Sequence, residues 1–220
     1  MQIDQLIQLM LDGTKETLYM VVVSTLVSYL LGIPIGVILY TTDKDGIIQN
    51  GIINKVLGII VNLLRSVPFI ILLVAILPFT RAVVGTTIGS TATIVPLVVA
   101  AAPFVARMVE SSLKEVDAGI IEAAQAMGSS PFQIIWKVLL PEAKPSLLVG
   151  STIAITTILG YSAMAGFVGG GGLGAIAINY GYYRYQTNVM LITVVLLVIV
   201  VQIFQEAGMH IAKRADKRTK

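Results

Sequence analysis

Long apolar stretches alternate with short polar ones along this chain. Five of the apolar stretches reach about 20 residues, the length that lets a helix cross the hydrocarbon core of a bilayer. They cover residues 18–40, 57–79, 88–109, 147–168 and 189–207. Prolines fall inside them, among them Pro34, Pro68, Pro96 and Pro103, and membrane helices tolerate proline because neighbouring helices satisfy the freed backbone groups. The pattern predicts an all-α polytopic membrane protein with five transmembrane helices, forming one transmembrane domain over residues 1–220.

Composition argues against a soluble protein. Hydrophobic residues make up 56% of the chain and charged residues only 12%, whereas soluble domains carry about 25% charged residues. The apolar excess must therefore face lipid. The chain has no cysteine and one histidine, His210, which excludes thiolate metal sites and disfavours a histidine metal site. We expect a protein that is not an enzyme, with no catalytic residue, cofactor or metal of its own.

Lysines and arginines are distributed unequally among the segments between the apolar stretches. With the N-terminus outside, eleven of them lie on the cytosolic side, and three, Lys15, Arg81 and Arg184, lie outside. Cytosolic segments of membrane proteins are enriched in these residues. We therefore expect the N-terminus outside and the C-terminus in the cytosol. The basic end, residues 213–220, is expected to meet anionic lipid headgroups and not nucleic acid.

The longest polar insertion, residues 110–146, is cytosolic in this orientation. Asp117 is suited to cap a helix over residues 118–127. Gly128 then supplies the left-handed residue that commonly ends a helix. The insertion is therefore predicted to begin with a short, well-delimited helix.

A second helix is predicted directly after the first. Ser130 and Gln133 have the spacing of a capping box, and Pro141 is expected to end this helix. Four apolar residues follow helical spacing along it: Phe132, Ile135, Trp136 and Leu139. Such a stripe packs either against the membrane helices of its own chain or in a groove of a partner protein.

The same insertion resembles the EAA loop in the permease subunits of ABC importers. It carries EAA, a glycine after three further residues, and VLLP after nine more, where the family pattern has isoleucine in place of Val138. The matching residues are Glu122, Ala123, Ala124, Gly128, Leu140 and Pro141. In that family the loop forms a coupling helix that docks on an ATP-binding subunit, so the resemblance implies this role for these residues.

Three other segments resemble the methionine-importer branch of these permeases: residues 65–69, 102–107 and 161–174. The resemblance implies a homodimer in the bacterial inner membrane, with two separate ATP-binding subunits that carry ATP and Mg²⁺. It also implies an external solute-binding protein, D- or L-methionine as substrate, and transport by alternating access. An importer for another small amino acid is one alternative. A proton-driven secondary transporter is another, but the inverted repeats common in such proteins are not evident here.

The fourth apolar stretch ends in small, hydroxyl-bearing and flexible residues before a glycine run, 169–174. We expect Tyr161, Ser162 and Met164 to line the substrate pathway, with Met164 as a gate because an unbranched thioether repacks readily. Met164 is equally suited to fill a gap between helices. The glycine run lacks the lysine and hydroxyl residue of a phosphate loop, and it predicts a flexible external turn.

Overall fold

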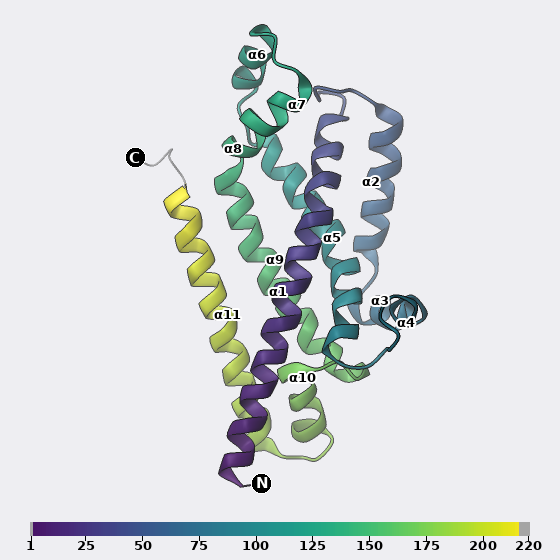
Figure 1. Ribbon diagram of the computed structural model, residues 1–220, viewed down its shortest axis with the longest axis vertical. Coiled ribbons are helices and arrows are strands. Elements are labelled where there is room, and N and C mark those ends of the chain that lie inside the picture. The colour runs from purple at the N-terminus through teal and green to yellow at the C-terminus, as the bar shows by residue number, and fades with distance from the viewer. Residues whose placement is uncertain (1, 216–220) are drawn as a thin grey trace.

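The computed structural model describes residues 2–215, and every regular element among them is helical. The long helices run side by side, while α6 and α7 project at one end and α10 lies near the other (Figure 1). The elements are α1 (Ile3–Thr41), α2 (Gly51–Ser66), α3 (Phe69–Ala75), α4 (Leu77–Val84), α5 (Ser90–Lys114), α6 (Ala118–Ala126), α7 (Pro131–Ile134), η1 (Ile135–Leu139), α8 (Leu140–Glu142), α9 (Lys144–Met164), η2 (Ala165–Val168), α10 (Gly172–Ile176), η3 (Ala177–Tyr182) and α11 (Thr187–Ala215). The predicted all-α fold is confirmed for this part of the chain.

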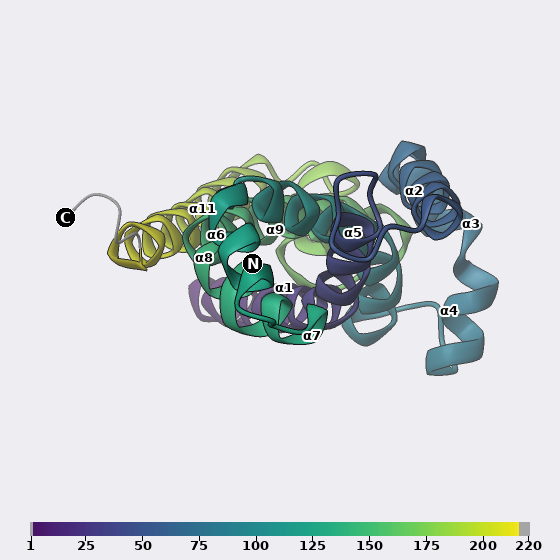
Figure 2. The same cartoon turned by 90° about the horizontal axis from the view of Figure 1, so that it is seen from above.

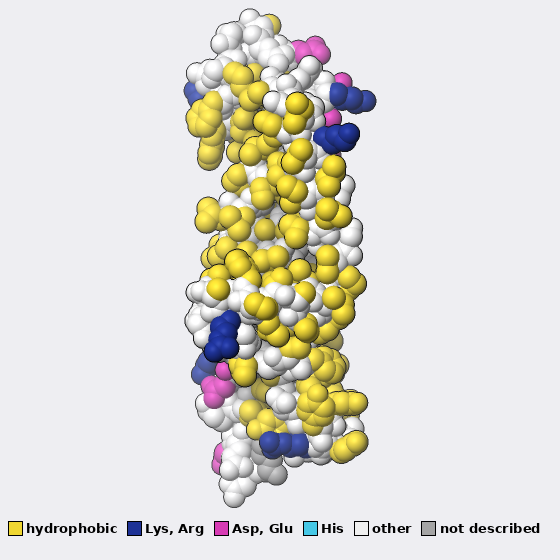
Figure 3. Space-filling model, turned by 90° about the vertical axis from the view of Figure 1, so that its right-hand side faces the viewer, with side chains coloured by type: hydrophobic (Ala, Val, Ile, Leu, Met, Phe, Trp, Pro, Cys, Tyr) yellow, Lys and Arg dark blue, Asp and Glu magenta, His cyan; other side chains and the backbone are white. Residues whose placement is uncertain are grey.

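Four stretches are long and apolar enough to cross a membrane, and a bent helix pair makes up to five. Seen along the long axis, α1, α5 and α9 form the centre, with α2 to α4 on one flank and α11 on the other (Figure 2). On the face formed by α2 to α4, apolar side chains cover the middle of the molecule and charged ones gather toward its ends (Figure 3). This distribution matches a protein that crosses a bilayer along its long axis.

The bent pair corrects the prediction of one continuous helix over residues 57–79. Helix α2 ends at Ser66, and α3 leaves it at an angle of 101°. Pro68 explains the break, because its ring disfavours the helical conformation at the preceding residue. Val67 accordingly has an extended backbone, with φ −80° and ψ 124°.

Helices α1 and α5 make the closest packing in the centre of the molecule. Residues four apart on α1, namely Ser24, Ser28, Gly32 and Gly36, are buried along one face. A Cβ atom on Gly36 would lie 2.5 Å from the carbonyl oxygen of Ala106 on α5. Small residues at this spacing let two membrane helices approach closely, as they do here.

Helix α1 begins well before its predicted start at residue 18. Its first turns carry Met10, which packs in an apolar cluster with Leu173, Ile176 and Val189 from α10 and α11. This burial explains why the polar beginning of the chain is helical. At 1.5 Å per residue, the 39 residues of α1 span about 58 Å, nearly twice a hydrocarbon core. Part of α1 therefore extends beyond the membrane.

Candidate coupling site and transport pathway

The first helix of the EAA loop, our name for residues 110–146, forms as its capping signals predict. The Asp117 carboxylate accepts a hydrogen bond from the backbone N–H of Gly119 at 2.8 Å. Helix α6 ends at Ala126, and Gly128 follows with φ +77°. A Cβ atom on Gly128 would meet nothing within 4 Å, so glycine is suited to this position by its backbone conformation and not by close packing.

The second helix begins as predicted and ends one residue after Pro141. Ser130 and Gln133 form the predicted capping box, and the helix starts at Pro131. It then passes through the π-helical segment η1 into α8 and reaches Glu142. A π-helical turn widens the backbone just before Pro141, which relieves the clash that a proline makes in a regular helix.

The apolar stripe of the second helix divides between two environments. Leu139 is fully buried, in a core cluster that also contains Ile121 and Ala124 of α6. Phe132 and Trp136 are instead 69% and 59% exposed. Together with two exposed residues near α6, they form what we call the apolar tip: Ile120, Met127, Phe132 and Trp136. The tip lies where the loop projects from the bundle (Figure 1).

The six residues that match the EAA pattern differ in their exposure to solvent. Ala124 is buried against the core cluster, and Leu140 is half-buried. The other four are exposed: Glu122, Ala123, Gly128 and Pro141. The motif thus supplies one surface that anchors the loop and another that is open to a partner.

A buried ion pair lies at the predicted start of the polar loop. Glu110 belongs to α5, which continues to Lys114, and its side chain is 9% exposed. Its carboxylate accepts hydrogen bonds from Arg107 at 2.6 Å and from Lys114 at 2.9 Å. The spacing of these three residues, three and four apart on one helix face, was the signal available in the sequence.

These contacts extend to α2 and to the loop before it. Arg107 also donates to the Gly58 carbonyl at 3.1 Å and to the Asn62 side chain at 2.9 Å. Lys114 also contacts the Asp43 carboxylate at 3.0 Å. The hydrogen bond from the Lys114 ammonium is the main cause that holds the pKa of Asp43 below its usual value, and the hydrogen bond from the Lys44 backbone N–H is the second. We call Asp43, Arg107, Glu110 and Lys114 the root network.

The predicted pathway residues lie near the far end of α9. Tyr161 stacks on Phe69 of α3, with ring centroids 4.4 Å apart and planes within 4°. Ser162 is buried and donates its hydroxyl to the Leu159 carbonyl at 2.7 Å. Met164 is 47% exposed. Tyr161 therefore ties α9 to the broken helix pair, while the pathway and gate roles remain predictions.

The glycine run is a packed turn, so the prediction of a flexible one is wrong. The Gly172 N–H donates to the Glu16 carboxylate at 2.6 Å, and the Gly89 N–H donates to the Gly169 carbonyl at 2.9 Å. A Cβ atom on Gly166, just before the run, would lie 2.5 Å from the carbonyl carbon of Gly174. These glycines allow backbone segments to touch, which a sequence does not distinguish from flexibility.

Membrane-length helices, with a capped loop that projects from one end and presents an exposed apolar tip, define a polytopic membrane protein. The chain belongs to the family of binding-protein-dependent transport system inner membrane components, whose family model matches residues 32–214. It is therefore a multi-pass permease component of the inner membrane.

Similar proteins cover most of the chain or nearly all of it. A probable D-methionine transport system permease from Vibrio cholerae is 55% identical, over 96% of this chain and 93% of its own. The D-methionine transport system permease of Escherichia coli K12 is 53% identical over 72% of this chain and 73% of its own. A solved inward-facing methionine ABC transporter contains a chain that is 50% identical, with a TM-score of 0.96, covering 99% of this chain and 100% of that one.

Proposed function

We propose that this chain is the transmembrane permease of an ATP-driven methionine importer. The observation that carries the proposal is 55% identity to a D-methionine permease over nearly the full length of both chains. The similarity to a chain of a solved methionine ABC transporter points the same way. The substrate is methionine, as the D- or L-isomer or both.

The working complex contains two copies of this chain, two ATP-binding subunits and an external solute-binding protein. The apolar tip supports docking of an ATP-binding subunit, because exposed apolar groups beyond the membrane lose contact with water when a partner covers them. ATP and Mg²⁺ are bound by those subunits. The N-terminus lies outside and the C-terminus in the cytosol, which is supported by the excess of lysine and arginine on the cytosolic side.

Movement passes from the EAA loop to the pathway through packed contacts. A push on the apolar tip moves α6, whose Ile121 and Ala124 pack in the same core cluster as Val109 and Leu113 of α5. The root network carries this displacement from α5 to α2, because Arg107 bonds directly to Gly58 and Asn62. ATP binding and hydrolysis on the partner subunits thereby alternate the pathway between outward and inward openings.

The pathway itself lies near the end of α9, with Met164 as a gate. Support comes from its 47% exposure at the last residue of α9, directly before η2. Met164→Ala should alter the number of substrates moved per ATP, and Met164→Trp should block transport with the complex intact. Normal transport in both variants, or failure of both only through loss of assembly, would assign Met164 to packing.

The function is tested by purifying the chain from its native membrane and identifying the proteins that copurify. An ATP-binding subunit should be among them, and the reconstituted complex with its binding protein should accumulate labelled methionine only when ATP is supplied. A complex that carries Gly128→Val serves as the control for coupling, because this substitution alters the EAA loop and leaves the residues of the transport pathway unchanged. Uptake of another amino acid but not methionine would overturn the substrate, and uptake driven by a proton gradient without ATP would overturn the class.

A further inference from the structure

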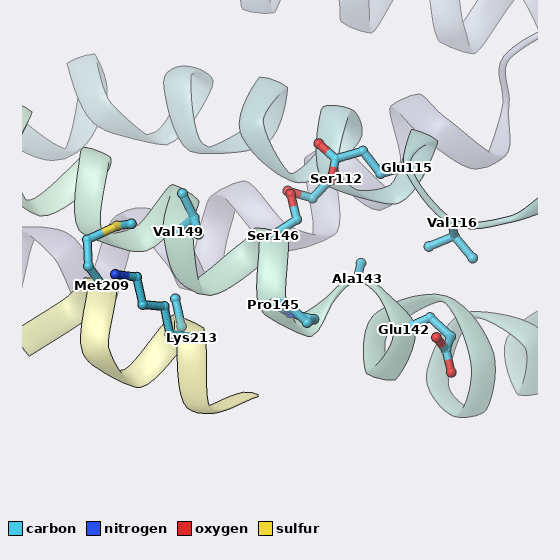
Figure 4. Close-up of a pocket in the computed structure, with 11 residues that line it drawn as sticks. Ser112, Glu115, Val116, Glu142, Ala143, Pro145, Ser146, Val149, Met209 and Lys213 are labelled. Carbon is cyan, nitrogen blue, oxygen red and sulfur yellow. The ribbon is translucent and has the colours of Figure 1, made fainter. Parts of the chain in front are cut away.

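Two cavities of this chain differ in how their hydroxyl groups are satisfied. In a cavity of about 390 Å³ between α5, α9 and α11, the Ser112 and Ser146 hydroxyls bond each other at 3.0 Å (Figure 4). A much smaller cavity, of about 10 Å³, lies between α4, α5 and the glycine turn that follows η2. Thr80 of α4 lines it, and the Thr80 hydroxyl has no hydrogen-bond partner within residues 2–215. The smaller cavity therefore contains an unsatisfied polar group.

The position of the Thr80 hydroxyl calls for a partner. Thr80 is only 1% exposed, so bulk water does not reach it. A buried hydroxyl group that has lost its hydrogen bonds to water and gained none in the protein destabilises the folded state. Native proteins satisfy most buried polar groups, either with other protein groups or with ordered water. Thr80 thus points to a small polar ligand in this cavity.

Two buried residues of α5 bring further polar groups to the same cavity. The Thr93 hydroxyl donates its hydrogen to the Gly89 carbonyl at 3.0 Å, which leaves the Thr93 oxygen free to accept. Pro96 has no N–H, so the carbonyl of Ala92, four residues earlier in the helix, lacks its usual helical donor. Ala92 and Pro96 both line the cavity. The lining therefore combines one hydroxyl that can donate with two oxygens that can accept.

This combination matches the hydrogen-bonding capacity of water. We propose that the cavity between α4 and α5 is the binding site of a single structural water molecule. The water accepts the hydrogen of the Thr80 hydroxyl and donates to the Thr93 hydroxyl oxygen and the Ala92 carbonyl oxygen. A buried water typically makes about three hydrogen bonds and needs about 10–15 Å³ of accessible space, so this cavity has room for one molecule.

Other ways to fill or satisfy the site fit less well. A cation would remain uncompensated, because no aspartate or glutamate lines the cavity. An amino acid is far larger than the available space. Rotation of the Thr80 hydroxyl onto the Ile76 carbonyl of its own helix would need no ligand, but it would leave the Ala92 carbonyl without a donor. A water molecule satisfies both residues at once.

The water joins segments that protein groups alone do not connect. Within residues 2–215, no hydrogen bond runs directly between α4 and α5. Helix α4 belongs to the arm that follows the break at Pro68, and Gly170 of the glycine turn closes another side of the cavity. The water thus attaches this arm to α5 beside the glycine turn. Its role concerns the fold of this end of the molecule and is independent of the solute that is transported.

The direct test is a structure of the full chain with its copurifying subunits, at a resolution that shows ordered water elsewhere in the complex. One density peak should lie about 2.7–3.0 Å from Thr80 Oγ1. Thr80→Ser keeps the hydroxyl and should keep the peak, whereas Thr80→Val should lose it. The proposal is overturned by the absence of a peak in the unmodified chain, or by a peak at about 2.3–2.6 Å from several oxygens, as for a bound metal cation.

Thermal unfolding of the full chain gives a second test, in which the sign of the effect decides. With the water bound, Thr80→Val breaks a hydrogen bond and should lower the melting temperature by about 2–4 °C. Without the water, the same substitution removes an unpaired polar group and should leave the melting temperature unchanged or raise it.

Thr25→Val is the matched control for this measurement. The Thr25 hydroxyl also has no partner within the described residues, but Thr25 lies outside the lining of this cavity. Its replacement should therefore not lower the melting temperature. A melting temperature for Thr80→Val that equals or exceeds that of the unmodified chain would contradict a bound water. The density peak in the unmodified chain needs no variant, so it remains decisive even if a substitution impairs folding.

Discussion

At the scale of single residues, Glu110 places one carboxylate between two cations inside the membrane domain. We expect Glu110→Ala to lower the free energy of unfolding by about 1–3 kcal/mol, because Arg107 would be left with an unpaired, partly buried charge. Thermal unfolding of the purified chain measures the loss. Glu206→Gln is the control, since Glu206 is exposed on α11. Equal melting temperatures for the two variants would show that the root network contributes nothing to stability.

Gly128 is the residue on which the shape of the EAA loop most directly depends. Gly128 has a φ of +77°, and a residue with a β-branched side chain in this conformation would destabilise the turn by about 1–2 kcal/mol. Gly128→Val should therefore leave the chain inserted but weaken binding of the ATP-binding subunit, measured by copurification. Gly128→Asn should retain binding, because asparagine tolerates the left-handed region. If valine binds as well as asparagine, the turn is not required for docking.

At the scale of helices, the contact between α1 and α5 depends on small residues. Gly36→Leu should separate the two helices and lower stability by about 1–3 kcal/mol or more, because its Cβ atom would already press on the Ala106 carbonyl. Gly160→Leu is the matched control, since a Cβ atom there meets nothing within 4 Å. Thermal unfolding in detergent compares the stabilities of the two variants. A smaller loss for Gly36→Leu than for Gly160→Leu would contradict the packing.

Helix existence and capping were predictable because their causes are local. The caps of the EAA loop needed only Asp117, Ser130 and the glycine between them, and the apolar stretches marked the spans. The break at Pro68 was missed because a membrane helix also tolerates proline without breaking, as α5 does at Pro96 and Pro103. Whether a helix breaks at a proline depends on which neighbouring helices pack against the freed backbone groups. A single sequence does not contain this information.

The candidate site was predictable only in part. The EAA pattern located the coupling loop, but it did not separate the buried Ala124 from the exposed Glu122. The root network was missed because three of its contacts join α5 to residues more than 40 positions away, namely Gly58, Asn62 and Asp43. Contacts of this kind follow from how helices assemble and not from local spacing.

At the scale of the whole molecule, the orientation in the membrane is open to a direct test. The chain has no cysteine, so a single introduced cysteine carries the only thiol. In intact cells an impermeant thiol reagent should label Gln5→Cys, at the exposed start of α1, and should leave Gln125→Cys on α6 unmodified until the membrane is permeabilised. The cysteine-free chain provides the background. Labelling in the reverse order would place the EAA loop outside the cell.

The small-residue face of α1 also has a consequence for biosynthesis. Its partner α5 begins at Ser90, about fifty residues after α1 ends at Thr41, which the ribosome takes about 2–10 seconds to add. During that interval α1 is in the membrane without the helix that packs on Gly32 and Gly36. The chain must therefore be held by the insertion machinery, or wait in lipid with this face uncovered, until a helix that is not its neighbour in sequence arrives.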